Sequence, residues 1–440
     1  MKALMKIAAS LSLLMWVILT VTIAVAQLTV GNPETAQSAD SFVNSVGVDV
    51  HLHNGDSLYA NFAEVEKALK DLGVRHIRDG LIDTQWMPYY DRLNELGKLG
   101  IKSTLITTPI ESDTVLANYP RRVPESFEAF EAPNEYDLSG DPNWAVTLNS
   151  FMARLYRAVK SDPIASHFPI IGPSLTRAES FPKVAASAPF FDYVNLHNYF
   201  GGRNPGTPGW GDNGYGSYGW NLNLVRVTWP GKPVITTETG YYNDLSDPSG
   251  IPEDVSAKYL PRVLLEQWMH GIQRTFFYQL LDLGNKEKYS DNSFGLVHSD
   301  FTPKAGYRAI QGLLQLLSDP GPPFRLNPLN FELSGDLTNV HHLLLEKRDG
   351  TFYLALWVEL PSYDVNAKTP LPVAVHKIVV QTKERMEMRV YQFDGDGHIS
   401  NSPYETQQTR SLDVDDRVSI LQIGAPFLPP PSNLKVIEIK

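Results

Sequence analysis

The chain has 440 residues, with 38 basic and 49 acidic side chains and a formal net charge of -11 at pH 7. This acidic balance argues against nucleic acid or an anionic membrane as a partner, because both repel a negatively charged surface. The sequence contains no cysteine, which excludes disulfides and thiolate metal sites. A chain of this length can be stabilised by its own hydrophobic core and is long enough for more than one domain.

The first 26 residues have the pattern of a secretory signal peptide. Lys2 and Lys6 precede an apolar run that ends in Ala24-Val25-Ala26, the small-x-small pattern that signal peptidase cleaves. The alternative is an uncleaved membrane anchor, since the run is long enough to span a bilayer. Both predict export. We therefore expect a secreted or periplasmic protein that is attached to a membrane only if this segment is retained.

From residue 44 onward, short apolar runs alternate with amphipathic helical stretches, which is the signature of repeated βα units around a parallel sheet. Eight such units in about 280 residues match a closed (β/α)8 barrel better than an open doubly wound sheet. We predict an α/β fold with a TIM barrel over residues 27–320 and its chemistry at the carboxyl ends of the strands. The predicted strands are 43–51, 74–80, 102–108, 127–134, 168–174, 192–199, 232–240 and 273–282.

Helical periodicity is clearest in four of the connections. In one of them, apolar residues from Leu148 to Val159 recur at steps of three and four, so that one stripe faces the sheet. Pro261 lies inside another and predicts a kink or an early turn, because proline removes an N–H and clashes one turn back. These four predicted helices are 61–73, 144–161, 254–271 and 303–319.

After residue 320 the pattern changes to strands without a helical period, and we predict a small antiparallel β-sandwich over residues 321–440. Residues 341–358 are predicted to form a hairpin in which Asp349-Gly350 supplies the positive φ of a tight two-residue turn. Further strands are expected near 374–381, 387–393, 417–423 and 434–439.

Two carboxylates fall at strand ends, Glu135 after the fourth predicted strand and Glu238 at the end of the seventh. A closed barrel brings both onto one rim. Cleavage of a glycosidic bond needs such a pair, one acid to protonate the leaving oxygen and one carboxylate to attack the anomeric carbon or to activate water. Either residue alone is interpreted equally well as an ordinary charged group at a strand terminus or as a catalytic residue. It is the presence of both that favours catalysis.

With Asn134 directly before Glu135, this pair resembles clan A of the glycoside hydrolases, the retaining (β/α)8 enzymes. The resemblance covers about residues 40–320. It implies that Glu135 is the general acid/base, that Glu238 is the nucleophile and that Asn134 hydrogen-bonds the sugar 2-hydroxyl. A retaining mechanism requires the two carboxyl groups to lie about 5 to 5.5 Å apart.

Three further residues match the clan. His197 and Tyr199 resemble the His-x-Tyr of family 5, in which the tyrosine hydrogen-bonds the nucleophile. Arg78 is similar to the clan's arginine that keeps the nucleophile ionised, and an opposite charge nearby would lower the pKa of Glu238. The alternatives are that Arg78 pairs with Asp79 or another carboxylate, and that His197 and Tyr199 are packed strand residues.

The sequence also departs from the clan. Tyr136 follows Glu135 where proline is common, and the third predicted strand ends without the histidine usual in family 5. The eighth lacks the usual sugar-stacking tryptophan, a role that Tyr278 or Gln279 could take. Residues 295–310 resemble families 5 and 39, and a sandwich after the barrel resembles family 39, so the family stays open.

Other residues could reach the rim. His53 could contact a sugar hydroxyl, although a lone histidine is more often structural. With His51 it forms His-x-His, which also suggests zinc, but no third ligand pattern accompanies it and no metal is predicted. The long loop at 201–220 is rich in aromatic residues that either stack on sugar rings or pack within the loop. They are Trp210, Tyr215, Tyr218 and Trp220.

We therefore expect a secreted retaining β-glycosidase that cleaves a polysaccharide or oligosaccharide by double displacement, without a cofactor and without a nucleic-acid or protein partner. The alternatives are a non-catalytic carbohydrate-binding protein on the same fold and a transglycosylase. The predicted catalytic residues are Glu135 and Glu238. The predicted substrate-binding residues are Asn134, Arg78, His197, Tyr199, His53, Trp210 and Tyr278.

Overall fold

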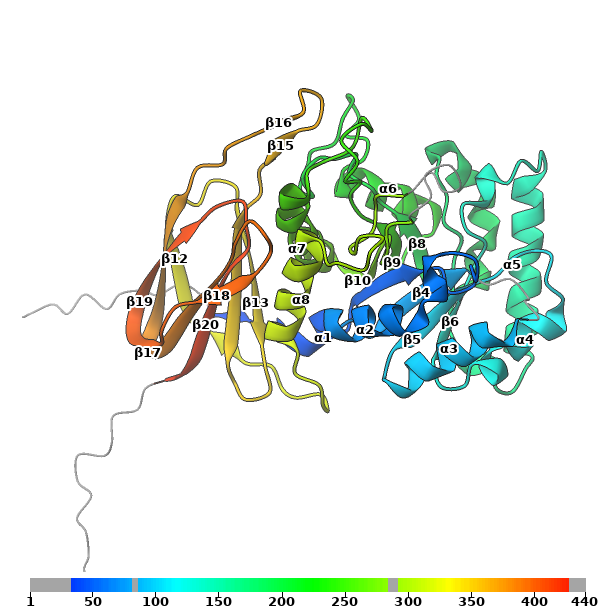
Figure 1. The fold of residues 1–440 in the computed structure, drawn as a ribbon, viewed down its shortest axis with the longest axis horizontal. Helices are drawn as coiled ribbons and strands as arrows, with labels where there is room; N and C mark the ends of the chain where they lie inside the picture. The colour runs from blue at the N-terminus through cyan, green and yellow to red at the C-terminus, as the bar shows by residue number, and fades with distance from the viewer. Residues whose placement is uncertain (1–32, 81–85, 284–291, 427–440) are drawn as a thin grey trace, which may run out of the picture.

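The structure is a computed structural model that describes residues 33–80, 86–283 and 292–426. The predicted signal segment and the strand predicted near 434–439 lie outside these residues. Figure 1 shows a barrel of strands surrounded by helices, with a β-sandwich packed beside it. Within the described ranges, no helix has the length and apolar character needed to cross a membrane.

Eight parallel strands form the barrel, in the order β7-β6-β5-β4-β3-β10-β9-β8. An isolated parallel bridge between Ile171 and Tyr193 joins β7 to the chain just before β8 and closes the ring. The predicted barrel and its eight predicted strands are confirmed. The strands are β3 (Val46–Val50), β4 (His76–Gly80), β5 (Lys102–Ile106), β6 (Phe127–Glu131), β7 (Ile170–Ile171), β8 (Val194–His197), β9 (Val234–Thr239) and β10 (Ile272–Phe277).

Helices cover the outside of the barrel (Figure 1). The connection from β7 to β8 is an exception, because its 3-10 stretch η4 (Ala178–Phe190) contains two prolines and a non-helical Val184. Helix α7, in contrast, continues through Pro261, so that the turn expected there does not divide it. The helices are α1 (Ala39–Val43), α2 (Phe62–Leu72), α3 (Met87–Lys98), α4 (Asp113–Arg122), α5 (Trp144–Lys160), α6 (Tyr218–Thr228), α7 (Glu253–Met269) and α8 (Ala305–Leu317).

Alternate strand residues point into the barrel and form layers. One layer is apolar, and Gly47 makes room in it for the ring of Phe276, since a Cβ at Gly47 would lie 2.4 Å from that ring. Its other members are Ala129, Ile171 and Ile235. The next layer is buried and polar. Because buried charged groups need partners, this layer is a candidate base for a functional site. Its members are Asp49, Arg78, Glu131, Asn195 and Thr237.

The second domain is a β-sandwich whose strands pair in the order β12-β17-β20-β14-β13-β2, with β18 and β19 also paired to β17. Strand β17 has 18 residues and pairs with β12 along its first half and with β20 along its second. The two strands predicted at 374–381 and 387–393 are therefore one strand. The strands are β12 (Phe331–Gly335), β13 (Val340–Glu346), β14 (Phe352–Val358), β17 (His376–Phe393), β18 (Ile399–Asn401), β19 (Glu405–Val414) and β20 (Ser419–Pro426).

The predicted hairpin is formed by β13 and β14, but its turn differs from the prediction. Three residues separate Lys347 from Thr351. The backbone N–H of Lys347 donates a 2.9 Å hydrogen bond to the C=O of Thr351. Only Gly350 has a positive φ, of 81°. The turn is thus a three-residue hairpin loop that ends in a left-handed glycine, and the predicted two-residue turn was wrong.

The two domains are joined by more than the linker. Strand β1 (Glu34–Thr35) pairs with β11 (Pro328–Leu329), and β2 (Gln37–Ser38) pairs with β13. Residues that the sequence division placed with the barrel therefore add strands to the second domain. Strand β14 is buried on both faces, with Tyr353 and Trp357 in the core of the barrel and the alternate residues in the core of the sandwich. A continuous apolar interface results.

Candidate active site

The guanidinium group of Arg78, on β4, lies at the centre of the polar layer. Its Nε and Nη2 atoms each donate a 2.8 Å hydrogen bond to the carboxylate of Glu131. Nη1 donates to Glu238 at 2.7 Å and to Asp49 at 3.3 Å, and Nη2 donates to Asn134 at 2.6 Å. The side chain is 3% exposed and all three nitrogens are engaged by protein acceptors. Arg78 therefore holds these groups in place. It also borders the cavity described below, and its predicted part in binding substrate stays a prediction.

One guanidinium group here faces three buried carboxyl groups, those of Asp49, Glu131 and Glu238. Burial holds the pKa of Asp49 well above its ordinary value, and the charges of Glu238 and Glu131 add to this against the lowering effect of Arg78. The Oδ1 atom of Asp49 has no hydrogen-bond partner among the described residues. A proton retained on Asp49 reduces the negative charge that Arg78 must balance.

Glu238, on β9, is held at both carboxylate oxygens. Oε1 accepts the bond from Arg78, and Oε2 accepts a 3.0 Å hydrogen bond from the Tyr199 hydroxyl. Burial alone would raise the pKa of Glu238, but the charges of His197 and Arg78 and the two hydrogen bonds outweigh it, and the pKa lies below its ordinary value. A carboxylate that stays ionised and is fixed in place is suited to attack an electrophilic carbon.

Glu135 follows β6 and leads into the 3-10 turn η2 (Tyr136–Leu138). Its φ of 42° is in the left-handed region, which is uncommon for a residue with a side chain. The Glu135 N–H donates to Oγ of Ser174 at 3.0 Å, and Oε1 lies 2.8 Å from Nδ1 of His197. Its side chain is 26% exposed, against 10% for Glu238, so the two carboxylates differ in their contact with solvent.

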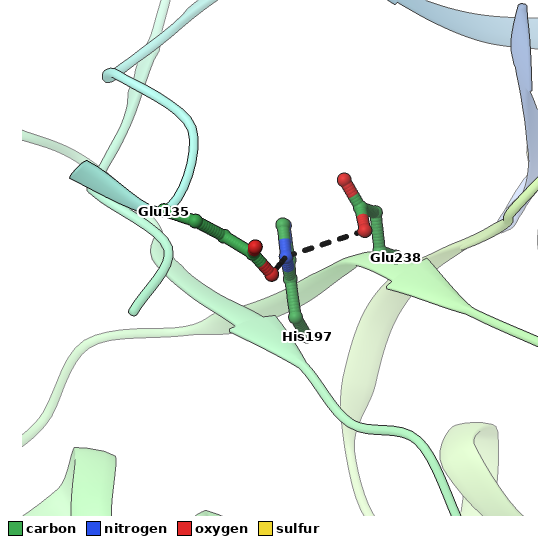
Figure 2. Close-up of side chains that lie close together, drawn as sticks. All are labelled: Glu135, His197 and Glu238. Carbon is green, nitrogen blue, oxygen red and sulfur yellow. Dashed lines mark hydrogen bonds and ion pairs between the residues drawn. The ribbon is translucent and has the colours of Figure 1, made fainter. Parts of the chain in front are cut away.

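Figure 2 shows the imidazole of His197 between the carboxylates of Glu135 and Glu238. One oxygen of each carboxylate and a ring nitrogen of the histidine all lie within 4.8 Å of one another. The two carboxylates are therefore close enough for both to act at one bond. These residue types also bind divalent cations, and among the described residues this is the one group of three so arranged.

Glu135 and Glu238 border a cavity of about 540 Å³ at the carboxyl ends of the strands. Asn134, His53 and Tyr278, which the sequence predicted to bind substrate, also line it. Nδ1 of His53 lies 2.6 Å from Asp79, so Asp79 pairs with His53 and not with Arg78. Burial lowers the pKa of His53, but the charge and hydrogen bond of Asp79 outweigh it and the pKa is raised.

The end of β10 resolves one alternative. Gln279 is fully buried and does not border the cavity, whereas Tyr278 does. The Tyr278 ring lies edge-on to His51 at 5.8 Å and to Phe294 at 5.7 Å. Burial and the neighbouring His53 lower the pKa of His51 to about 3, so His51 is neutral near pH 7.

The loop between β8 and α6 packs partly on itself. The ring of Trp210 lies 5.2 Å from that of Tyr215 and 4.4 Å from the guanidinium of Arg203. The ring of Tyr215 lies 4.6 Å from that of Trp220. Tyr218 is buried, so it belongs to the core. The other three also border a second cavity of about 270 Å³ beside the first, and their stacking on a sugar stays a prediction.

The second domain anchors the same loop. Glu359, directly after β14, accepts hydrogen bonds from Nδ2 of Asn204 at 2.7 Å and from the N–H of Gly206 at 2.8 Å. Its Oε2 accepts a 2.7 Å bond from Nε of Arg262, on α7, and both charged side chains are buried. Burial would raise the pKa of Glu359, but Arg262 outweighs it and the pKa is lowered. The sandwich thus helps to position a loop at the catalytic rim.

The sequence analysis missed Asp49, Glu131 and Glu359. Asp49 and Glu131 did carry a signal, since each is an acidic residue inside an apolar run predicted as a buried strand. A charge in such a strand needs a partner across the barrel. Glu359 carried no comparable signal, because its contact with Asn204 depends on how the two domains dock.

No protein-family model matches the sequence, and a search of curated proteins found no match. Solved structures do share its fold. A family 39 glycoside hydrolase from Bacteroides cellulosilyticus WH2 has a TM-score of 0.58 and 17% identity, over 88% of this chain and 82% of its own. The fold is that of family 39 glycoside hydrolases. It combines the barrel with the sandwich, as the resemblance implied.

Two further solved structures share this fold. A monomeric β-xylosidase from Caulobacter crescentus CB15 has a TM-score of 0.58 and 15% identity, over 89% of this chain and 97% of its own. A glucosidase from Croceicoccus marinus has a TM-score of 0.60 and 12% identity over the same shares of the two chains. Of the two families that the sequence left open, the fold favours family 39.

Proposed function

We propose that the protein is a secreted retaining β-glycosidase that hydrolyses O-glycosidic bonds in a polysaccharide or oligosaccharide. The observation that carries this proposal is the pair formed by Glu135 and Glu238, whose oxygens approach within 4.8 Å beside a cavity of about 540 Å³. The β-xylosidase and the glucosidase that share the fold support a neutral sugar as the substrate.

In the first step, the Glu238 carboxylate attacks the anomeric carbon while the Glu135 carboxylic acid gives its proton to the leaving oxygen. The bond between the anomeric carbon and the leaving oxygen breaks, and the sugar becomes an ester of Glu238. The hydrogen bonds from Arg78 and Tyr199 to the two oxygens of Glu238 keep the nucleophile ionised and oriented before attack.

In the second step, the Glu135 carboxylate takes a proton from a water molecule whose oxygen attacks the anomeric carbon. The ester bond breaks and Glu238 leaves as a carboxylate, which Arg78 and Tyr199 stabilise as its charge returns. Two inversions at the same carbon give retention of configuration. The larger exposure of Glu135 suits this role, since that residue exchanges a proton with water and Glu238 does not.

Asn134 is assigned to the sugar 2-hydroxyl. Its Oδ1 atom accepts a hydrogen bond from Arg78, which fixes the amide so that its NH2 group is the donor for a ligand. A hydrogen bond to the 2-hydroxyl that strengthens in the transition state lowers the barrier to glycosidic cleavage.

Glu238→Gly and Glu135→Ala test the assignment against aryl β-glycosides, with Glu95→Ala, an exposed glutamate on α3, as the control. We expect both site variants to lose at least about a hundredfold in kcat and the control to be unchanged. Azide should restore turnover of Glu238→Gly, because the small anion occupies the space of the lost carboxylate. The product should be a glycosyl azide of inverted configuration. Near-normal turnover in both site variants, or an inverted product from the wild-type protein, would overturn the proposal.

Export is proposed from the sequence pattern alone, with cleavage after Ala26. Expression of the full chain, followed by N-terminal sequencing of the protein from the medium or the periplasm, tests this. A mature chain that starts at Gln27 is expected, whereas a full-length chain recovered only with membranes would support the anchor instead.

A further inference from the structure

The second cavity of about 270 Å³ has no role in the two steps described above. It lies between η4 and α6 and shares Glu135, Tyr199 and Gly201 with the main cavity. The acid/base carboxylate therefore stands at the boundary between the two spaces. This is the position from which it reaches the oxygen that joins the sugar to its leaving group.

The lining of this cavity is mainly apolar. Buried side chains from the segment after β7, from η4 and from β8 border it, and half-buried ones come from α6 and from the loop before α6. The apolar residues that define it are Leu175, Phe181, Leu196, Trp210, Trp220 and Leu224.

Three of the polar side chains that border the second cavity have hydrogen-bond partners elsewhere. The Thr176 hydroxyl donates to Asp137 at 3.1 Å. Nδ2 of Asn221 donates to the carbonyl of Ser217 at 3.0 Å. The ring nitrogens of His197 face carboxylates and a threonine hydroxyl in the polar layer. The hydrogen-bonding groups that remain are the Glu135 carboxylate at the boundary and the single polar atoms at the edges of aromatic rings.

The two cavities therefore suit different chemistry. A sugar in the second cavity would bury several hydroxyl groups without partners, at a cost of about 1 to 3 kcal/mol each. An apolar group would gain about 0.8 kcal/mol for each methylene removed from water. The main cavity, in contrast, is bordered by charged and hydrogen-bonding side chains from seven strands or strand ends, and it suits a sugar.

We propose that the second cavity is the leaving-group subsite and that it takes an apolar aglycone, aromatic or aliphatic, in place of a further sugar. This inference rests on the proposed function and narrows the substrate to glycosides in which a sugar is joined through oxygen to a hydrophobic group. The chemistry stays that of glycoside hydrolysis, with water as the co-reactant and a free alcohol or phenol as the second product.

Alkyl β-glycosides from ethyl to octyl provide the test, because the basicity of the leaving alcohol changes little along the series while its apolar area grows. We expect kcat/KM of the wild-type protein to rise roughly three- to fourfold for each methylene that enters the cavity. The hydrolysis of the glycosyl-enzyme ester should not change, because the same ester forms from every member of the series.

Leu224→Ser and Trp220→Ala should each weaken the dependence of kcat/KM on chain length. Two substitutions are used so that the test still holds if one of the variants folds poorly. Val227→Ser is the matched control, since Val227 lies on the same helix and is 74% exposed. The binding of octyl β-thioglycoside, which resists hydrolysis, gives a second readout by calorimetry on the wild-type protein and the three variants.

The subsite would be overturned if kcat/KM of the wild-type protein did not change with chain length. It would also be overturned if kcat/KM rose as steeply in Leu224→Ser and Trp220→Ala as in the wild-type protein. A protein that hydrolyses no glycoside yet binds the octyl thioglycoside more tightly than the ethyl one, with loss in Leu224→Ser, would overturn the proposed function and leave the apolar subsite standing. Equal binding of the two thioglycosides would overturn the subsite independently of turnover.

Discussion

The hydroxyl of Tyr199 donates a 3.0 Å hydrogen bond to Oε2 of Glu238, the carboxylate whose Oε1 accepts a bond from Arg78. One donor lies on β4 and the other just after β8, and together they restrict rotation of the carboxylate. Because both bonds favour the ionised form, they link the geometry of the site to its pH dependence.

Tyr199→Phe should lower kcat/KM by roughly ten- to a hundredfold, because a hydrogen bond to a charged group contributes about 1.5 to 3 kcal/mol. The acidic limb of the pH profile should also move to higher pH, since the pKa of Glu238 rises when this donor is lost. Measurements of kcat/KM against pH check both effects. Tyr404→Phe, on the surface of the sandwich, is the control, and an acidic limb that stays in place in Tyr199→Phe would contradict the assignment.

Arg262→Met should destabilise the protein by about 3 to 5 kcal/mol, because it leaves the buried carboxylate of Glu359 without its charged partner. The matched control is Lys377→Met, which removes an ion pair with Asp413 between side chains that are 78% and 58% exposed, and should cost at most about 1 kcal/mol. Urea unfolding gives both free energies. Equal effects of the two substitutions would show that the interdomain pair is not a structural requirement.

His51→Gln should weaken the dependence of stability on pH below neutrality. The pKa of His51 is about 3 in the folded protein and 6.5 in the reference state, so in this window the unfolded chain binds a proton that the folded chain does not. Stability therefore falls as the pH is lowered from 6.5 towards 3, by up to about 1.4 kcal/mol per pH unit. Unfolding at pH 7 and pH 5 measures this slope, which His398→Gln, an exposed control, should leave unchanged.

Removal of metal ions should leave activity unchanged, because the proposed steps use only protons and the carboxylates of Glu135 and Glu238. Added zinc should inhibit, since these carboxylates and His197 are ligands that the ion prefers, and a bound ion would occupy the lone pairs needed for attack. Rates after dialysis against a chelator, together with metal analysis, check this. Activity that is lost on dialysis and returns with a metal ion would contradict the proposed mechanism.

The sequence was sufficient to predict the barrel and many of the residues on its rim. Parallel strands are buried on both faces and appear as apolar runs, and the carboxyl ends of all such strands meet at one rim. Glu135, Glu238, His197 and Tyr199 could therefore be grouped although they are far apart in the chain. The polar layer was less visible, because the partners of Asp49 and Glu131 lie on other strands.

Other features depend on tertiary contacts that no local pattern reports. The pairing of Glu359 with Arg262 requires the docked domains, and the length of β17 follows from partners on both halves of the strand. The aromatic loop was ambiguous for a similar reason. Its residues both pack on one another and border a cavity, and only the positions of η4 and α6 show that the cavity is apolar.

The pairing of β1 and β2 with strands of the second domain bears on how this architecture can be exchanged between proteins. Residues 34–38 precede the barrel in the chain, yet they pair with β11 and β13, which follow it. A chimera that takes only the barrel from a relative would remove β2 and leave the Leu345–Glu346 end of β13 as an open edge, which is a template for aggregation. A recombination boundary should therefore be placed after residue 38, so that the acceptor sandwich keeps its own edge strand.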